Sequence, residues 1–347
     1  MAAPAVPSSA CTGITLKAAD GACIVARTIE WGGSNLNSRY VVVPRGYVQH
    51  SFLPDGTADG MVMKARYGYV GLAVERSEFV AEGINEAGLS AGLFYFPGYG
   101  RYVEYEADRK DVTVSDLQVV PWILGSCATV DDVKKAVAEA SIVGIYPGAS
   151  TVHWRFTEPS GRQVVLEIID GEAIFYENEL GVLTNSPDFE WQMTNLNNYV
   201  NLYPGAASDN ELGGVKLAPF GAGSGFLGIP GDVTPPSRFV RATFYQTSTP
   251  TQPTAFDAVE QALHILNNFD IPIGIETARG EKAADIPSAT QWTAVTDTMN
   301  RIIYYRTMYD SSVRCIELDK IDFGRISYRD EPLDETDREP VESIEIR

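Results

Sequence analysis

Basic side chains and histidines are both scarce in this chain of 347 residues. Its 27 lysines and arginines stand against 46 aspartates and glutamates, and the formal net charge is −19. Such a charge repels phosphate backbones and anionic lipids, so we expect neither nucleic acid nor a membrane surface as a partner. The three histidines, His50, His153 and His264, are far apart and form no His-x-x-x-His pair. A zinc site is therefore poorly supported, and we expect no metal or other cofactor.

The chain also lacks long apolar runs, internal repeats and any Cys-x-x-Cys pair. Without a run of about 18 apolar residues, no segment is predicted to span a bilayer. The wide spacing of the cysteines does not demand disulfides, and Cys23, Cys127 and Cys315 are most simply small buried apolar residues. With 44% hydrophobic residues, the chain is long enough for one large globular domain or two ordinary ones.

The first ten residues, Met1 to Ala10, consist mostly of small residues and prolines. They have neither the basic start nor the apolar stretch of a complete signal peptide. However, Ser8 and Ala10 are small residues at the third and first positions before Cys11, which suits a signal peptidase. We interpret residues 1–10 as the remainder of an export signal and expect a periplasmic or secreted protein. The alternatives are a disordered N-terminus, with a cytoplasmic protein, or a lipid-modified Cys11.

Strand patterns dominate the rest of the chain. Asp20-Gly21 predicts a hairpin turn between strands at 12–16 and 22–27. Further strands are predicted at 40–43, 152–156, 163–169, 173–176, 292–296 and 302–306. Because short turns join most of these segments, we expect largely antiparallel sheets.

Three segments predict helices between these blocks of strands. Thr129 to Asp132 forms a capping-box pattern at the start of a helix that runs to about residue 140. Residues 115–124 indicate a helix disturbed by Pro121, and residues 256–269 carry one apolar face. Together they predict an α+β fold in layers. We expect a single domain over 11–329 and an acidic, solvated extension over 330–347.

Cys11 is the strongest candidate for chemistry. If the chain is cut between Ala10 and Cys11, one residue holds both a thiol and a free α-amine. That amine has a pKa near 8 and can take the proton of the thiol, which makes a complete nucleophile for cleaving an amide. Arg27 ends the strand that returns beside Cys11 and would favour the thiolate, while Glu30 could accept hydrogen bonds from the amine. The alternative for Arg27 and Glu30 is a surface ion pair at a strand end.

Three other segments carry candidate site residues, and each signal is weak alone. An aromatic stripe around Tyr95 follows Gly83-Ile84-Asn85-Glu86. Asn185 lies at a predicted strand-to-turn junction, and residues 231–238 predict a rigid turn that delivers Arg238. Residues 223–228 fit the glycine pattern of dinucleotide sites but lack its strand–helix context, so we predict a tight loop there.

Taken in order, these motifs closely resemble those of the choloylglycine hydrolase family, which includes bile salt hydrolases and penicillin V acylases. The resemblance runs from Cys11 to about Tyr328. Its motifs are Cys11-Thr12-Gly13, Ala26-Arg27-Thr28, Pro44-Arg45-Gly46, Gly83-Ile84-Asn85-Glu86, Phe96-Pro97-Gly98-Tyr99, Leu183-Thr184-Asn185-Ser186-Pro187, Asn195-Leu196-Asn197-Asn198-Tyr199 and Pro230-Gly231-Asp232-Val233-Thr234-Pro235. It implies an N-terminal nucleophile hydrolase of linear amides, a four-layer αββα sandwich and a homotetramer.

The resemblance also implies roles for individual residues. Cys11 matches the nucleophile and Arg27 the arginine beside the thiol. Asn185 matches the asparagine of the oxyanion hole, whose other donor is the backbone N–H at the position of Tyr95. Arg238 matches a second active-site arginine.

One position departs from the family. Glu30 stands where the family usually has Asp, which lengthens the reach of the carboxylate by about 1.5 Å at a site with little tolerance for misplacement.

The substrate is less clearly indicated than the reaction. Conjugated bile salts and penicillin V both require an apolar pocket. The residues expected to help line it are Ile29, Trp31, Tyr69, Phe94 and Phe96. The overall pattern favours glycine- and taurine-conjugated bile salts. Tyr95 favours penicillin V or another N-acyl amide, because bile salt hydrolases commonly have Asn there. An inactive binding relative is the third hypothesis, since Glu30 or a retained leader could prevent turnover.

Overall fold

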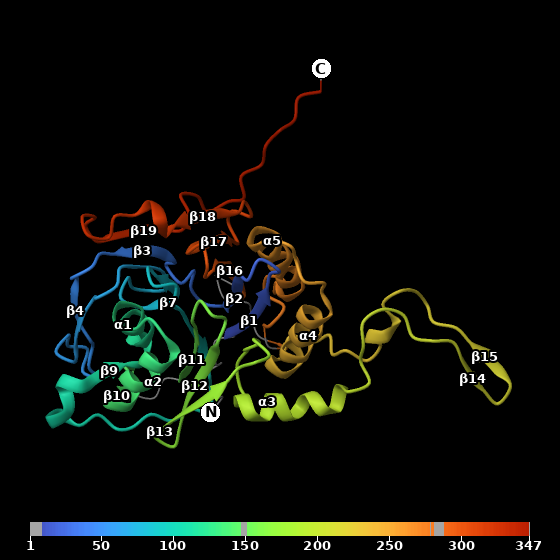
Figure 1. Ribbon diagram of the computed structural model, residues 1–347, viewed down its shortest axis with the longest axis horizontal. Coiled ribbons are helices and arrows are strands. Elements are labelled where there is room, and N and C mark those ends of the chain that lie inside the picture. Colours follow the sequence, from blue (N-terminus) through green and yellow to red (C-terminus); the bar gives the residue numbers. More distant parts are fainter. Residues whose placement is uncertain (1–8, 147–150, 278, 281–287, 347) are drawn as a thin grey trace.

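Two large antiparallel sheets pack face to face at the centre of the fold, with helices on both outer faces (Figure 1). The computed structural model describes residues 9–146, 151–277, 279–280 and 288–346. Most of the predicted leader, residues 1–8, therefore lies outside the described residues. The arrangement is the expected four-layer αββα sandwich.

The five-stranded sheet carries Cys11. In spatial order its strands are β1 Ser9–Lys17, β2 Cys23–Trp31, β16 Ala289–Asp297, β17 Ile302–Thr307 and β18 Arg314–Glu317. The predicted turn between β1 and β2 is confirmed, with Gly21 at φ +94°, a conformation that glycine adopts without strain. This turn sets the register of the two strands and thereby the residues opposite Cys11.

The eight-stranded sheet lies behind it. Its spatial order is β13 Glu172–Glu177, β12 Gln163–Ile169, β11 Val152–Thr157, β8 Ser90–Tyr95, β7 Val80–Asn85, β6 Tyr69–Ala73, β3 Arg39–Val43 and β19 Arg329–Pro332. The central strands β6 and β7 are buried on both faces, because the other sheet covers one side and a helix the other. Short pairs lie outside both sheets: β4 Val48–His50 with β5 Val62–Lys64, and the parallel pair β9 Thr113–Ser115 with β10 Ser141–Val143.

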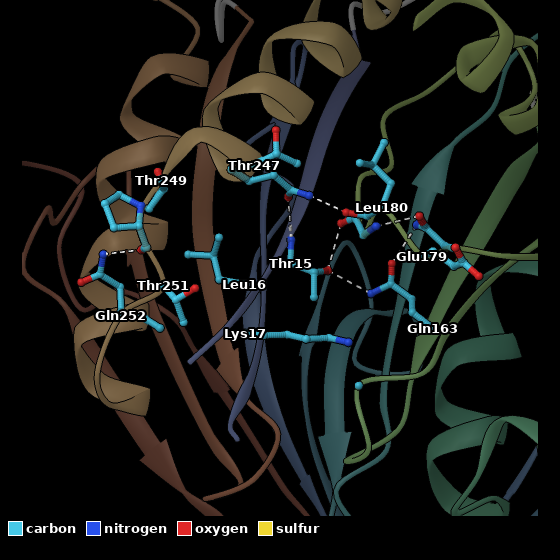
Figure 2. A pocket seen from close by; sticks show the side chains of 16 residues that line it. Thr15, Leu16, Lys17, Gln163, Glu179, Leu180, Thr247, Thr249, Thr251 and Gln252 are labelled. Carbon is cyan, nitrogen blue, oxygen red and sulfur yellow. Dashed lines mark hydrogen bonds between the residues drawn. The ribbon is translucent and has the colours of Figure 1, made fainter. Parts of the chain in front are cut away.

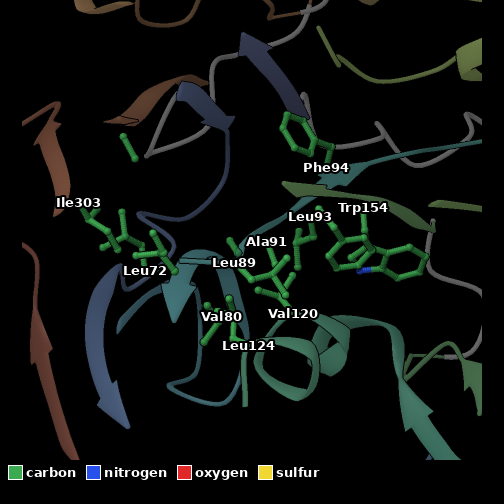
Figure 3. Packing of buried hydrophobic residues seen from close by; sticks show 14 of the residues in the cluster. Leu72, Val80, Leu89, Ala91, Leu93, Phe94, Val120, Leu124, Trp154 and Ile303 are labelled. Carbon is green, nitrogen blue, oxygen red and sulfur yellow. The ribbon is translucent and has the colours of Figure 1, made fainter. Parts of the chain in front are cut away.

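Helices complete the layers. On the eight-stranded sheet, α1 Val119–Ser126 packs on β7 and β8, and α2 Val130–Glu139 packs on β11 and β13. On the five-stranded sheet, α4 Pro235–Ser248 and α5 Ala255–Leu266 pack against β1. The short helix α3 Phe189–Asn195 contacts α4. Apolar side chains of the eight-stranded sheet and α1, among them Leu72, Ala91, Trp154, Val120 and Leu124, form a continuous core (Figure 3).

Two helix predictions need correction. Residues 231–238 are not only a turn, since Pro235 begins α4 and Arg238 lies in its first turn. Proline is favoured there because the first helical N–H has no partner within the helix. The helix predicted over 115–124 is α1, which begins four residues later, so that Pro121 also falls in a first turn. The capping box at Thr129 is confirmed: its side chain accepts from the Asp132 N–H, and Asp132 accepts in return.

The predicted boundary at residue 330 is wrong by several residues. Strand β19 pairs with β3, and the side chain of Leu333 is buried. Asp334 forms an ion pair with Arg314 at 2.8 Å. Only residues 335–346 are exposed throughout, and the end of the chain points away from the body (Figure 1).

A hairpin arm, between α3 and α4 in the sequence, projects from the molecule at the right of Figure 1. It consists of β14 Asn210–Leu212 and β15 Val215–Leu217. All six strand residues are exposed, and Phe220 just beyond them is fully so. The arm thus presents apolar side chains that this chain itself does not cover.

Candidate active site

Cys11 lies in the middle of the sandwich, on the strand at the edge of the five-stranded sheet. The register of β1 and β2 places it opposite Ile29, and its side chain is 3% exposed. Arg27 lies two residues before Ile29 in β2, opposite Gly13, and its Nη2 donates to the Cys11 Sγ at 2.8 Å. The structure therefore places the guanidinium of Arg27 directly beside the Cys11 thiol.

Some groups around the Cys11 thiol raise its pKa and others lower it. Burial raises the pKa of Cys11, and the positive charge of Arg27 opposes this by favouring the thiolate. The negative charge of Glu30 raises the pKa further, whereas a hydrogen bond from the Tyr95 backbone and the charge of Arg238 lower it. Arg27 is thus the largest influence that stabilises the reactive form.

Arg27 is held rigidly, although it is fully buried. Its guanidinium donates to the backbone carbonyls of Leu93 and Ala81, the latter at 3.2 Å. Its Cζ lies 4.2 Å from the centre of the Phe94 ring, and its Nη1 lies 3.8 Å from a carboxylate oxygen of Glu82. These contacts fix the direction in which the guanidinium points.

Asn185 reaches Cys11 from a different part of the chain. An isolated antiparallel bridge joins Leu183 to Gly13 through two backbone hydrogen bonds of 2.7 and 3.1 Å. The Asn185 Oδ1 accepts from the Cys11 N–H at 2.8 Å and from Arg238 Nη2 at 2.7 Å. Because both partners can only donate, this side of the carboxamide must be the oxygen. The Nδ2 then donates to the Tyr95 carbonyl at 2.7 Å, and its second hydrogen has no partner in the described part of the chain.

Arg238 ties the start of β1 to α4. Its Nη1 donates to the Cys11 carbonyl and, at 2.9 Å, to the Thr12 hydroxyl. Its Nε donates to the Val233 carbonyl at 2.8 Å, just before the helix. This buried arginine therefore orients Cys11 and Asn185 together.

Glu30 is fully buried, so the surface ion pair considered for Arg27 and Glu30 is excluded. One carboxylate oxygen accepts from the Thr290 hydroxyl at 3.2 Å, and the other has no hydrogen-bond partner. Burial raises the pKa of Glu30 to about 7, against the lowering effect of Arg238. In the strand register Glu30 lies opposite Ala10, directly beside the bond between Ala10 and Cys11.

The five residues expected to line a pocket are not brought together. Trp31 is half-buried and packs edge-on against Tyr95, with ring centres 6.2 Å apart, and Ile29 lies opposite Cys11. Phe94 and Phe96 are fully buried behind the site. Tyr69 lines a cavity whose lining does not include Cys11. Tyr47 and Trp122 also line this cavity, on the helix side of the eight-stranded sheet.

Four buried charged or titratable residues near the site were not predicted as site residues. Arg155 Nη2 donates to Glu82 at 2.9 Å, which links both to Arg27. His153 and Glu167 form a second pair, with the His153 Nδ1 3.0 Å from Glu167 Oε1. All four lie inside strands with apolar neighbours, and that pattern is the one signal in the sequence that could have revealed them.

A polar cavity of about 330 Å³ lies at the other end of β1, around Thr15 and Lys17 (Figure 2). Two of its glutamines are hydrogen-bonded to Thr15: Gln163 donates to the Thr15 hydroxyl at 3.0 Å, and Gln246 accepts from the Thr15 N–H at 3.1 Å. Its lining does not include Cys11, Arg27 or Asn185, so we do not assign it to the chemistry.

Within the described residues, no group of three or more His, Cys, Asp or Glu side chains could hold a metal ion. In the same part of the chain, no helix is long and apolar enough to cross a membrane.

Comparisons with known proteins agree with this geometry. Residues 11–337 match the model of the linear amide C–N hydrolases, choloylglycine hydrolase family. A bile salt hydrolase/transferase from Clostridium perfringens is 30% identical over 89% of this chain and 93% of its own length. A penicillin V acylase from Pectobacterium atrosepticum is 22% identical over 87% of this chain and 78% of its own. The crystal structure of a conjugated bile acid hydrolase from Clostridium perfringens superposes with a TM-score of 0.82 at 25% identity, covering 96% of this chain and all of the other.

The sandwich and its buried cysteine define a hydrolase of linear amide bonds with the N-terminal nucleophile fold. The chain belongs to the choloylglycine hydrolase family.

Proposed function

We propose that Cys11 becomes the first residue of the mature enzyme and attacks the amide carbonyl of its substrate. The observation that carries this proposal is the 2.8 Å contact between Arg27 Nη2 and the Cys11 Sγ inside a buried site. A buried cysteine with no charged partner would remain a thiol, because burial disfavours the thiolate. The freed α-amine takes the thiol proton, directly or through one water.

Two donors are available for the oxyanion. The second hydrogen of Asn185 Nδ2 has no partner among the described residues, and the Tyr95 backbone N–H points at the thiol. Arg238 keeps the Asn185 oxygen turned away from the substrate by donating to it at 2.7 Å. Preorganised donors of this kind stabilise the charge that develops in the transition state.

The reaction then proceeds in two balanced halves. The sulfur bonds to the carbonyl carbon, the C–N bond breaks, and the α-ammonium returns its proton to the departing amine. Water next attacks the thioester, releases the acid and restores the thiol. Glu30, opposite Ala10, is placed to accept hydrogen bonds from the amine and hold it beside the sulfur.

Removal of the leader is a requirement of this mechanism. In the intact chain the Cys11 nitrogen is an amide that donates to Asn185 at 2.8 Å and cannot accept a proton. We therefore expect active preparations to begin at Cys11, and intact-mass measurement with N-terminal sequencing tests this. The small residues Ser8 and Ala10 support cleavage by a signal peptidase in an exported protein. Activity in a chain that keeps Ala10 would overturn the assignment.

The proposed substrates are bile acids conjugated to glycine or taurine. The higher identity to a bile salt hydrolase than to a penicillin V acylase supports this choice, 30% against 22%. Trp31 is half-buried beside Tyr95 and offers an apolar surface at the site. The test measures amine release from glycocholate, taurocholate and penicillin V with one enzyme preparation. We expect the highest kcat/KM for one of the two conjugated bile acids.

Tyr95 supports penicillin V or another N-acyl amide as the second candidate, because the resemblance places Tyr there in the acylases. A higher kcat/KM for penicillin V in the same panel would favour it. Binding of glycocholate without release of glycine would instead indicate an inactive binding relative.

A homotetramer is the proposed assembly. The hairpin arm supports it, because Leu212 and Val215 are each 61% exposed at its tip and Phe220 is fully exposed. Light scattering of the full-length protein should give four times the mass of the chain. A variant with Leu212, Val215 and Phe220 changed to Ser should then have a lower mass.

A further inference from the structure

His153 is a buried histidine whose ring nitrogens both face acceptors. It lies on β11 opposite Phe94 in the strand register and is fully buried. Its Nε2 lies 3.1 Å from the Thr184 carbonyl oxygen, and its Nδ1 lies 3.0 Å from Glu167 Oε1. Its ring stacks on Phe96, with ring centres 4.4 Å apart and planes inclined by 7°.

The chemistry of these partners determines where the protons lie. A backbone carbonyl can only accept, so Nε2 carries a hydrogen. Glu167 Oε1 already accepts from the Phe189 N–H at 3.0 Å, and a further proton must lie between this oxygen and His153 Nδ1 for the two to attract. His153 and Glu167 together therefore hold two of these protons, one on Nε2 and one between Nδ1 and Oε1, whereas a neutral imidazole beside an ionised carboxylate would hold only one. Tyr176 lies on the neighbouring strand β13, and its pKa is raised to about 12 by burial and then by the negative charges of Glu167, Asp188 and Glu190.

This pair joins the two chain segments that present the proposed oxyanion donors. Thr184 directly precedes Asn185, and Phe189 begins α3 just after it. Phe94 and Phe96 flank Tyr95, and both rings pack against the imidazole. A second link, from the Ser186 hydroxyl to the Pro97 carbonyl at 2.6 Å, joins the same segments at the surface side.

We propose that His153 and Glu167 are positioning residues that set the distance between Asn185 and the Tyr95 backbone N–H. They touch neither the thiol nor the substrate. They act by clamping residues 184–189 to residues 94–97, so that both donors meet the oxyanion at once. The inference rests on the proposed oxyanion hole.

Kinetics of two variants test the clamp. His153→Phe keeps the stacking on Phe96 but removes both hydrogen bonds, and Glu167→Gln keeps the volume but removes the charge. We expect kcat to fall about 10- to 100-fold in each, with KM changed less than about threefold, because the donors act on the transition state rather than on the bound substrate. His264→Gln, at an exposed histidine, is the matched control and should match the wild type.

A further measurement, the alkylation rate of Cys11, separates positioning from general loss of structure. Alkylation of Cys11 by iodoacetamide needs the thiolate but no oxyanion hole, so its rate should stay within about twofold of wild type in both variants. A parallel fall of alkylation and kcat would overturn the proposal, as would an unchanged kcat in folded His153→Phe. If that variant does not fold, Glu167→Gln decides on the same criteria.

The wild-type protein provides an independent check, because it has only three histidines. Nitrogen NMR of ring-labelled histidine should show one residue with a protonated Nε2 whose signals are lost in His153→Phe. An unprotonated Nε2 at this residue would overturn the proposal.

The Asn185→Ala variant distinguishes failure of the proposed oxyanion hole from failure of the proposed clamp. If it leaves kcat unchanged, the oxyanion hole itself is wrong. If it abolishes turnover while the His153 variants are normal, only the clamp is wrong.

Discussion

The guanidinium of Arg27 reaches diagonally across the β1–β2 hairpin to the sulfur of Cys11, 2.8 Å away, although the strand register places Arg27 opposite Gly13. Gly13 makes this possible. A Cβ there would lie 2.9 Å from the Phe94 ring and 3.0 Å from the Arg155 guanidinium. The missing side chain leaves room for the Phe94 ring, above which Arg27 lies.

Replacement of the nucleophile should abolish turnover. Cys11→Ala removes the sulfur, and we expect amide hydrolysis to fall about 10³-fold or more, the usual cost of losing a nucleophile. Cys315→Ala is the control, because this cysteine is exposed and free and should be dispensable. Amine release measured on both processed proteins checks the prediction. Residual turnover above about a tenth in Cys11→Ala would contradict it.

Removal of the charge beside the thiol should raise the pKa of Cys11. We expect Arg27→Gln to shift it upward, because an opposite charge within hydrogen-bond distance favours the ionised form. The pH dependence of iodoacetamide alkylation measures the shift, and kcat/KM near neutral pH should fall about 10- to 100-fold. The matched variant is Arg45→Gln at an exposed ion pair with Glu86, which should leave the alkylation profile unchanged. Superimposable profiles for Arg27→Gln and wild type would refute the role of Arg27.

Glu30 should make the leader-bearing chain less stable as the pH rises. Its pKa is about 7 in the folded chain against 4.5 ordinarily, so the folded state holds the proton more tightly. Stability is therefore greatest below about pH 4.5 and declines until about pH 7, by at most about 3 kcal/mol from this group. Glu30→Gln carries no charge and should lack this decline.

The measurement is urea unfolding of both leader-bearing proteins at several pH values between 4.5 and 8. The free energy of unfolding of Glu30→Gln should rise relative to wild type across the window. A constant difference between the two proteins would show that Glu30 does not titrate there.

Glu82 should be essential for stability, because it is the carboxylate between two buried arginines. Its side chain is 1% exposed and lies 2.9 Å from Arg155 and 3.8 Å from Arg27. Glu82→Ala leaves these charges uncompensated and should reduce the free energy of unfolding by about 3–5 kcal/mol. Asp319→Ala breaks an exposed pair with Arg301 and should cost less than about 1 kcal/mol. Equal losses in the two variants would contradict the importance of the buried network.

The sequence predicted the parts of the fold that local chemistry determines. The turn at Asp20-Gly21 and the capping box at Thr129 depend on neighbouring residues and are confirmed. The position of Tyr69 depends instead on which face of β6 meets the second sheet, and strand periodicity does not say which face that is. Helix α4 escaped prediction because Pro235 and Pro236 indicate a turn as readily as the first turn of a helix.

In the candidate site, too, some residues were predicted from the sequence and others were not. The resemblance pointed to Cys11, Arg27, Asn185 and Arg238, and in the structure the other three each form a hydrogen bond to Cys11. The buried partners behind them, such as His153 and Glu167, lie 14 residues apart on adjacent strands. The two strands form an antiparallel hairpin with Trp154 opposite Leu166, so the contact depends on the register of this hairpin, which the predicted strand ranges alone did not specify.

The continuation of β1 through Ser9 and Ala10 has a consequence for the mature enzyme. These two residues are the partners of Trp31 and Glu30 on one side, while β16 occupies the other. In a chain cut before Cys11, the main chain of Glu30 and Trp31 would have no partner strand on that side, and its N–H and C=O groups next to the sulfur would be unpaired. A cut that frees the α-amine of Cys11 would therefore also expose an edge of the five-stranded sheet directly beside the nucleophile.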